Sequence, residues 1–175
     1  MKTHKLLILL FAFLVSANVY SQEEKNRKDL REETRQNEFR IIQGIIDSAN
    51  YVFEASKAYP QGGKMIDLTT NHGSLTVIDD SVIADLPFFG RSFSGGYSNT
   101  DGGMKFIGTM QNAKVEINEN KYKLTIKFTV NDSGNSYQCF LEVSSLTNAN
   151  LSITTANRSS ISYKGRVKSD AIIEE

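Results

Sequence analysis

The chain has 175 residues, and its 20 basic and 20 acidic side chains cancel to a formal net charge of zero. The length predicts one domain of ordinary size, and 39% hydrophobic residues are enough to build a core. The charge balance argues against the basic face that nucleic-acid binding requires and against a polybasic membrane-surface protein.

The first 21 residues have the pattern of a secretory signal peptide. A basic head at residues 2–5 precedes an apolar run over residues 6–15, and Val19 and Ser21 suit the two positions that a signal peptidase reads. The run is shorter than the roughly 20 apolar residues that span a bilayer. We expect cleavage after Ser21 and no membrane span in the mature chain, with an uncleaved anchor as the alternative. Cleavage removes two lysines, which leaves a net charge of −2.

Cys139 is the single cysteine, so no disulfide can form within the chain. No cysteine follows the apolar run, where a lipoprotein would carry its anchor. We therefore expect a periplasmic or secreted protein that is not lipid-anchored. Cys139 shares one face of a predicted strand with Tyr137 and Leu141, and we interpret it as a small core residue. The sequence shows no neighbouring cation or helix start that would activate the thiol.

A charged segment follows the signal peptide. Residues 23–40 combine charges of both signs with strong helix formers, and apolar residues become dense toward residue 46. This pattern predicts one helix over residues 27–47, exposed in its first half and packed in its second. The charged face is either solvated or bound to a partner. The predicted organisation is a signal peptide (1–21), a charged helical segment (22–40) and a single antiparallel β domain (41–175).

From Asn50 the apolar pattern changes to the alternation that is typical of strands. Turn residues divide the rest of the chain into predicted strands at 50–59, 65–69, 74–78, 81–85, 104–108, 113–117, 122–130, 136–144, 150–155 and 161–168. The alternation is clearest at 122–130, where Leu124, Ile126 and Phe128 should face inward. A glycine-rich loop is expected over residues 90–103.

About ten short strands with hairpin-type turns predict a mainly β fold. We expect an antiparallel meander that forms a barrel or a strongly curled sheet, with one N-terminal helix. The alternative is an α+β layer in which the helix packs on an open antiparallel sheet.

No catalytic or metal-binding pattern is found. His72 is the single histidine after the leader, which is too few for a zinc site, and no Gly-x-Ser-x-Gly motif accompanies it for a serine triad. Two carboxylates can meet from distant strands, and Asp79, Asp80, Asp85 and Asp101 are available. We predict no cofactor, no metal and no catalytic residue, with enzymatic activity less favoured than binding.

The segment from residue 86 to residue 93 contains three phenylalanines beside a glycine-rich stretch. One interpretation is an apolar plug that closes one end of a barrel or sheet. The other is the aromatic rim of a ligand cavity, with a single arginine as its charge. The candidate ligand-binding residues are therefore Phe88, Phe89, Arg91 and Phe93.

Several motifs occur in a fixed order along the chain. They are Tyr51-Val-Phe-Glu-Ala55, Pro60, Leu86-Pro-Phe-Phe-Gly90, Asp101-Gly-Gly103 with Phe106, and Arg158-Ser-Ser-Ile-Ser-Tyr-Lys-Gly165. Over about residues 39–167 the chain resembles a family of uncharacterised exported proteins from Bacteroidota, which is known as a domain of unknown function. The resemblance implies export and brings no activity, cofactor or catalytic residue.

Three functional hypotheses follow. The leading one is an exported, non-enzymatic binding module for an apolar or amphipathic small molecule, held between the sheet and the aromatic segment. The alternatives are a carboxylate-dependent hydrolase and a structural envelope protein that binds another protein through its helix or a strand edge. A hollow apolar interior favours the first, two converging carboxylates favour the second, and a filled barrel with a bare apolar helix face favours the third.

Overall fold

The computed structural model of the chain describes residues 27–93 and 102–170. The predicted signal peptide lies outside these ranges, and so do residues 94–101 of the predicted glycine-rich loop. Residues 27–47 form the predicted α-helix. The elements that follow are β1 (Asn50–Pro60), β2 (Ile66–Asp67), β3 (Gly73–Ile78), β4 (Ser81–Leu86), β5 (Met104–Asn118), the 3₁₀ helix η1 (Glu119–Lys121), β6 (Lys123–Asp132), β7 (Asn135–Ser145), β8 (Asn148–Thr155) and β9 (Arg158–Ser169).

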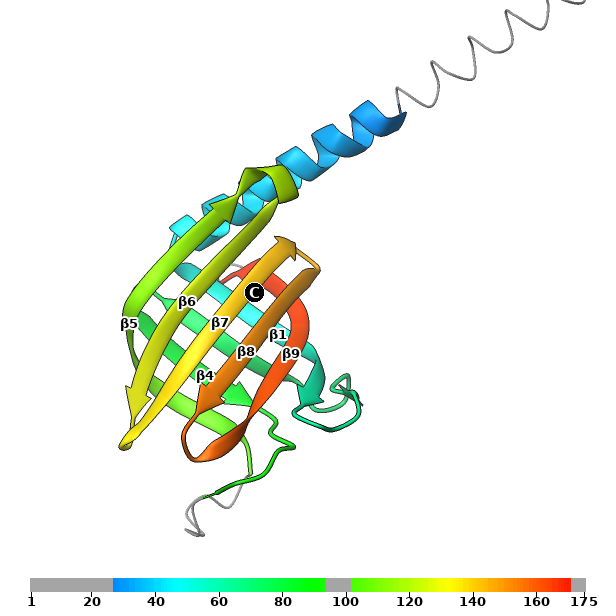
Figure 1. Cartoon of the computed structure of the whole chain (residues 1–175). Helices are drawn as coiled ribbons and strands as arrows, with labels where there is room; N and C mark the ends of the chain where they lie inside the picture. Colours follow the sequence, from blue (N-terminus) through cyan, green and yellow to red (C-terminus); the bar gives the residue numbers. More distant parts are fainter. Residues whose placement is uncertain (1–26, 94–101, 171–175) are drawn as a thin grey trace, which may run out of the picture. The chain divides into compact units, whose positions relative to one another are not determined.

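The strands form a closed antiparallel barrel (Figure 1). Strand order runs β1-β3-β4-β5-β6-β7-β8-β9, and the pairing of β1 with β9 closes the ring of eight strands. The two-residue strand β2 pairs with β1 at Lys57 and Ala58, beyond the stretch that pairs with β3. The predicted antiparallel barrel is thus confirmed, and the closure excludes the open-sheet alternative.

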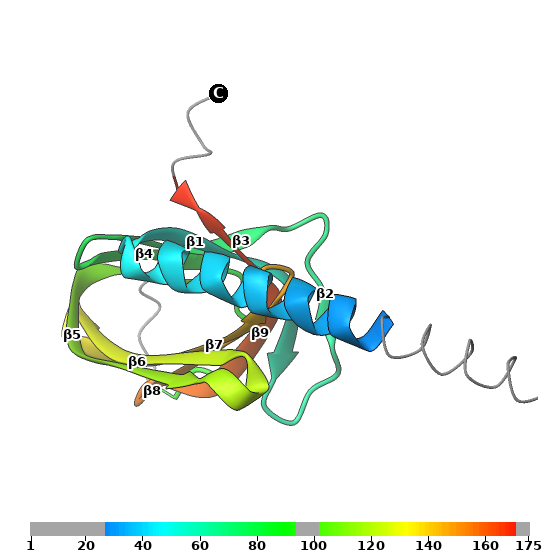
Figure 2. The ribbon, with the colours of Figure 1, turned by 90° about the horizontal axis from the view of Figure 1, so that it is seen from above.

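The chain divides into two compact units, residues 1–37 and residues 38–175. The described part of the first unit is helical and mostly exposed. In the second unit, the last turns of the helix lie across one end of the barrel (Figure 2) and bury Phe39, Ile42 and Ile46 in its core. Phe39 also packs edge-on against the ring of Tyr122, with 5.7 Å between centroids. We call this end of the barrel the helix end.

Strand β6 has the predicted alternation of inward and outward side chains, but one outward residue is buried. Leu124, Ile126 and Phe128 are buried as expected. Thr125, which the same alternation places on the outward face, is only 9% exposed. It faces outward, but the ion pairs Lys123–Glu142 and Lys127–Glu116, both 2.7 Å long, run diagonally across its two sides. These longer side chains cover the threonine.

Two of the predicted strands are one strand in the structure. The ranges 104–108 and 113–117 belong to the single strand β5. The register against β6 shifts between Gln111 and Lys114, which marks a β-bulge, and Asn112 has a φ of 54°. Asparagine tolerates this left-handed conformation better than most residues, so the bulge is absorbed without ending the strand.

Candidate functional site

The inside of the barrel is filled by apolar side chains. Inward-facing residues such as Leu75, Leu141 and Ile153 have exposed fractions of 0%. A cavity large enough for water would leave accessible area on the side chains around it. The interior of an eight-stranded barrel is narrow enough for side chains alone to fill. The packing therefore argues against a ligand site inside the barrel.

Cys139 belongs to this interior. Its side chain is buried on β7, and burial raises the pKa of the thiol to about 12. A thiol with such a pKa holds almost no thiolate at neutral pH and is a poor nucleophile. The prediction that Cys139 is a core residue is confirmed.

The four predicted ligand-binding residues lie at the end of the barrel opposite the helix end, which we call the far end. Phe88 is half-buried and packs against the core, and the guanidinium carbon of Arg158 lies 5.1 Å from its ring centroid. Phe89, Arg91 and Phe93 are exposed. The structure thus gives Phe88 the packing expected of a plug and leaves the other three side chains open to solvent.

Hydrogen bonds hold residues 87–91 against β9. The amide of Arg91 donates to the Ser159 hydroxyl, and the amide of Ser159 donates back to the Arg91 carbonyl, each over 2.9 Å. The buried Tyr163 hydroxyl donates to the carbonyl of Pro87 over 2.9 Å. Arg158, Ser159 and Tyr163 lie about 70 residues from their partners, so no local sequence signal identified them as neighbours of the aromatic segment.

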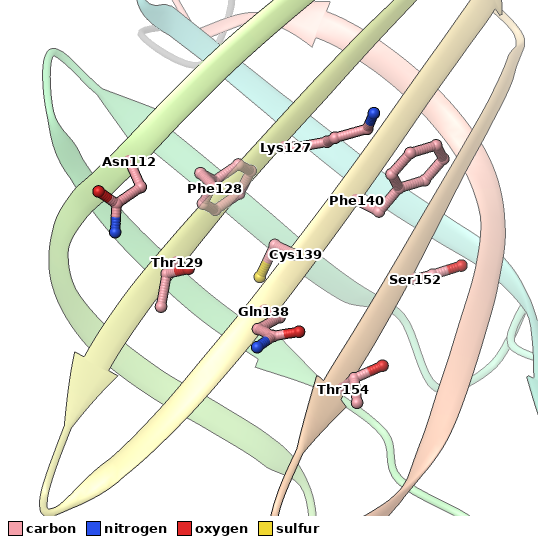
Figure 3. A pocket seen from close by; sticks show the side chains of 9 residues that line it. All are labelled: Asn112, Lys127, Phe128, Thr129, Gln138, Cys139, Phe140, Ser152 and Thr154. Carbon is pink, nitrogen blue, oxygen red and sulfur yellow. The ribbon is translucent and has the colours of Figure 1, made fainter.

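A shallow hollow of about 300 Å³ lies on the outer wall of β6, β7 and β8 (Figure 3). Phe140 is partly exposed in it, and the Lys127 ammonium lies 5.7 Å from the centroid of the Phe140 ring. The hollow is lined by Asn112, Lys127, Phe128, Thr129, Gln138, Cys139, Phe140, Ser152 and Thr154. No carboxylate or imidazole is among these residues, and the one thiol, that of Cys139, is buried with a raised pKa.

Two further hollows, of about 430 and 270 Å³, share Glu54, His72 and Arg166 on the outer wall near β1. Burial alone would raise the pKa of Glu54, but hydrogen bonds from Lys168 and Arg166 outweigh burial and hold the pKa below its usual value. A general acid for glycoside cleavage needs a raised pKa. Glu54 is therefore an ion-paired carboxylate that does not suit the role of general acid. Asp85 and His72 line the larger hollow with it, and Asp85 forms an ion pair with Lys105 over 3.4 Å.

The most unusual surface is the second half of β5. Strand β4 pairs with β5 only as far as Thr109, whereas β6 pairs with it as far as Asn118. In Figure 1 the hairpin of β5 and β6 extends beyond the neighbouring ends of β7 and β8. Among the described residues, the side of β5 opposite β6 therefore has no neighbouring strand over residues 112–118. We call this stretch the free β5 edge.

Side chains on the free β5 edge alternate between apolar and charged. Val115 and Ile117 share a face with their β6 partners Ile126 and Leu124, yet they are 51% and 50% exposed. Lys114 and Glu116 occupy the other face. All ten residues from 111 to 120 are exposed. An unpaired, partly apolar edge of this kind is a template for pairing with another chain.

Two observations concern metals and membranes. Within residues 27–93 and 102–170, no group of three or more His, Cys, Asp or Glu side chains is placed to hold a metal ion. In the same parts of the chain, no helix is long and apolar enough to cross a membrane.

These features define a small, closed antiparallel β-barrel protein with a packed interior and, within the described residues, a free stretch along the edge of β5. The chain belongs to the DUF4251 family, a domain of unknown function, whose pattern matches residues 33–167. The resemblance to a family of unknown function, predicted from the motifs, is confirmed. No curated protein matches the chain.

A solved relative has the same fold. The chain is similar to the crystal structure of a DUF4251 family protein from Bacteroides eggerthii DSM 20697, with a TM-score of 0.57 and 18% sequence identity. The match covers 78% of this chain and 88% of that chain. At this identity the likeness supports the barrel fold alone.

Proposed function

We propose that this protein is a non-enzymatic interaction module that acts outside the cytoplasm and binds an extended polypeptide segment. The segment would add to the barrel as one more strand along the free β5 edge. The observation that supports this proposal is that β5 over residues 112–118 has β6 as its only partner strand among the described residues. Strand addition supplies affinity through main-chain hydrogen bonds and specificity through alternate side chains.

The rest of the barrel is suited to presenting this edge. Because the interior is packed and the ring of strands is closed, β5 is held at a fixed position up to the last pair with β4, Ser81 and Thr109. Beyond that pair, alternate backbone amides and carbonyls turn away from β6 and toward an incoming strand. An incoming apolar side chain would pack on Val115 and Ile117 and remove their apolar surface from water.

A charge on the apolar face of the free β5 edge should block strand addition. Random nonapeptides selected for binding to the purified protein should be extended and alternately apolar. We expect Val115→Lys to weaken a selected peptide at least tenfold in a fluorescence anisotropy titration, because the ammonium would lie where an apolar side chain must pack. Binding should also shift the amide signals of residues 112–118 in an NMR titration.

Ile107→Lys is the matched control. Ile107 lies on the same strand and is 65% exposed, but there the edge of β5 that faces away from β6 farther along the strand is paired with β4, through Ile83. This variant should bind the selected peptide like the parent protein. Equal loss of affinity in both variants, or peptides that leave the amides of 112–118 unchanged, would refute strand addition at this edge.

A second candidate function uses the far end of the barrel. Phe89 and Phe93 expose aromatic rings beside Arg91, whose guanidinium offers several donors to a carboxylate or carbonyl group. An amphipathic small molecule could bind across this surface instead of inside the barrel. This keeps the apolar-ligand hypothesis as a proposal about the surface of the protein.

Truncation of one ring separates binding from packing at the far end. If the rings bind a ligand, Phe89→Ala should weaken binding of the apolar dye anilinonaphthalene sulfonate at least threefold while the urea midpoint stays unchanged. Phe140→Ala, which removes a partly exposed ring from the outer wall, is the control and should leave dye binding intact. A large loss of stability in Phe89→Ala, without dye binding by the parent protein, would leave only the plug interpretation.

A further inference from the structure

We propose that the strand added to the free β5 edge is the same edge of a second copy of this chain, so that two barrels join as an antiparallel dimer. This inference rests on the proposed strand addition and names its partner. The observation that supports it is the order of charges along the edge. When two copies of the strand run antiparallel, the lysine of each copy faces the glutamate of the other.

The pairing register follows from symmetry and charge. In a two-fold antiparallel pair, residues at equal distances on either side of the axis face each other. The continued sheet must also keep the apolar side chains of both copies on one face. Each residue must therefore face a residue of the same face, so the two-fold axis lies between the two copies of one residue. With the axis at Val115, Lys114 faces the partner's Glu116 and Glu116 faces the partner's Lys114.

The neighbouring registers are unfavourable. Centring the pair on Lys114 would place two lysines opposite each other, and centring it on Glu116 would oppose two glutamates. Like charges directly opposite each other destabilise a strand pair. The bulge between Gln111 and Lys114 and the start of η1 at Glu119 bound the stretch that can pair, so charge and not length selects Val115 as the centre.

The side chains on both faces fit this register. On the apolar face, Val115 would meet the partner's Val115, and Ala113 would meet the partner's Ile117. On the other face, the Glu116 carboxylate already accepts a hydrogen bond from Lys127 over 2.7 Å. The partner's Lys114 would approach Glu116 from the open side, which would place the carboxylate between two ammonium groups. Lys114 itself has no ion-pair partner in the described parts of the chain.

The contact is short, so the dimer should be weak. Five residues of each chain pair, and their interface is smaller than those of permanent complexes. We therefore expect a reversible equilibrium between monomer and dimer. In that equilibrium a longer peptide strand of suitable sequence would compete with the second copy for the same edge.

Charge reversal tests both the register and the partner. In sedimentation equilibrium, the parent protein should self-associate, and Lys114→Glu and Glu116→Lys should each self-associate at least tenfold more weakly. Each single variant would face like charges at both ion-pair positions of its homodimer. An equal mixture of the two variants should recover the association, because every such position in the mixed pair again joins opposite charges. Lys164→Glu, a charge reversal at an exposed site on β9, should behave like the parent protein.

The outcomes separate this inference from the function on which it rests. A parent protein that stays monomeric at its highest soluble concentration, while selected peptides still bind at residues 112–118, would refute the dimer and leave strand addition standing. Parent and variants that dimerise equally would place the contact elsewhere and refute the dimer as proposed. Absence of both peptide binding and association would refute the two proposals together. A urea melt of each variant, expected to match the parent protein, shows that the fold is retained.

Discussion

Replacing Phe128 by alanine should lower the free energy of unfolding by about 3–5 kcal/mol. The ring is buried inside the barrel on β6, and Phe128 is the direct cross-strand neighbour of Cys139 on β7. Truncation would leave a cavity among the buried side chains of the barrel, and the closed ring of strands limits how far its walls can collapse into it. Urea denaturation of the two proteins measures the difference.

The neighbouring residue provides the control for this experiment. Lys127 points outward from the same strand, and its ion pair with Glu116 is exposed to solvent. Lys127→Ala should change the free energy of unfolding by no more than about 0.5 kcal/mol, because exposed ion pairs contribute little. Similar losses in the two variants would show that the register of β6 is wrong.

The variant Gly165→Ala should lose at least about 3 kcal/mol of stability, at the upper end of what overpacking costs. A Cβ at this position of β9 would lie 1.9 Å from the carbonyl oxygen of Glu54 and 2.8 Å from its carbonyl carbon. Both atoms belong to the backbone of β1, so no side-chain rotation can relieve the clash. The closing pair of strands would have to separate near the bulge between Ala55 and Lys57.

Gly44 is the matched control for Gly165. It lies in the helix, and a Cβ added there would meet no atom within 4 Å. Gly44→Ala should therefore be neutral or stabilise the protein by up to about 1 kcal/mol, since alanine is the better helix former. If thermal melts gave both variants the same small shift, the close approach of β9 to β1 would be refuted.

Local periodicity was sufficient to predict the helix and most strands. The helix over 27–47 and the inward residues of β6 follow from spacing within a few residues. The closing pair could not be predicted in this way, because Tyr51 and its partner Ser169 lie 118 residues apart and neither segment marks the other. The continuity of β5 was also missed, because Gly108 and Asn112 resemble the end of one strand and the start of a turn.

The candidate sites show the same division between local and distant information. The sequence identified the aromatic segment, but the Arg158 that covers Phe88 comes from the other end of the β domain. The free β5 edge depends on where β4 begins, at Ser81, and this is a property of a neighbouring strand. The sequence of a strand alternates in the same way whether one or both of its edges are paired. The residues of β5 alone could therefore not show that one edge lacks a neighbouring strand.

The buried thiol of Cys139 gives a chemical measure of how often the barrel opens. A disulfide reagent reacts with a thiolate, and here both the raised pKa and the closed ring of strands keep that species from solvent. Reaction must therefore wait until β7 separates from a neighbour. When closing is fast relative to reaction, the labelling rate divided by that of the unfolded chain equals the equilibrium constant for this opening. One residue thus reports the local stability of the wall in buffer without denaturant.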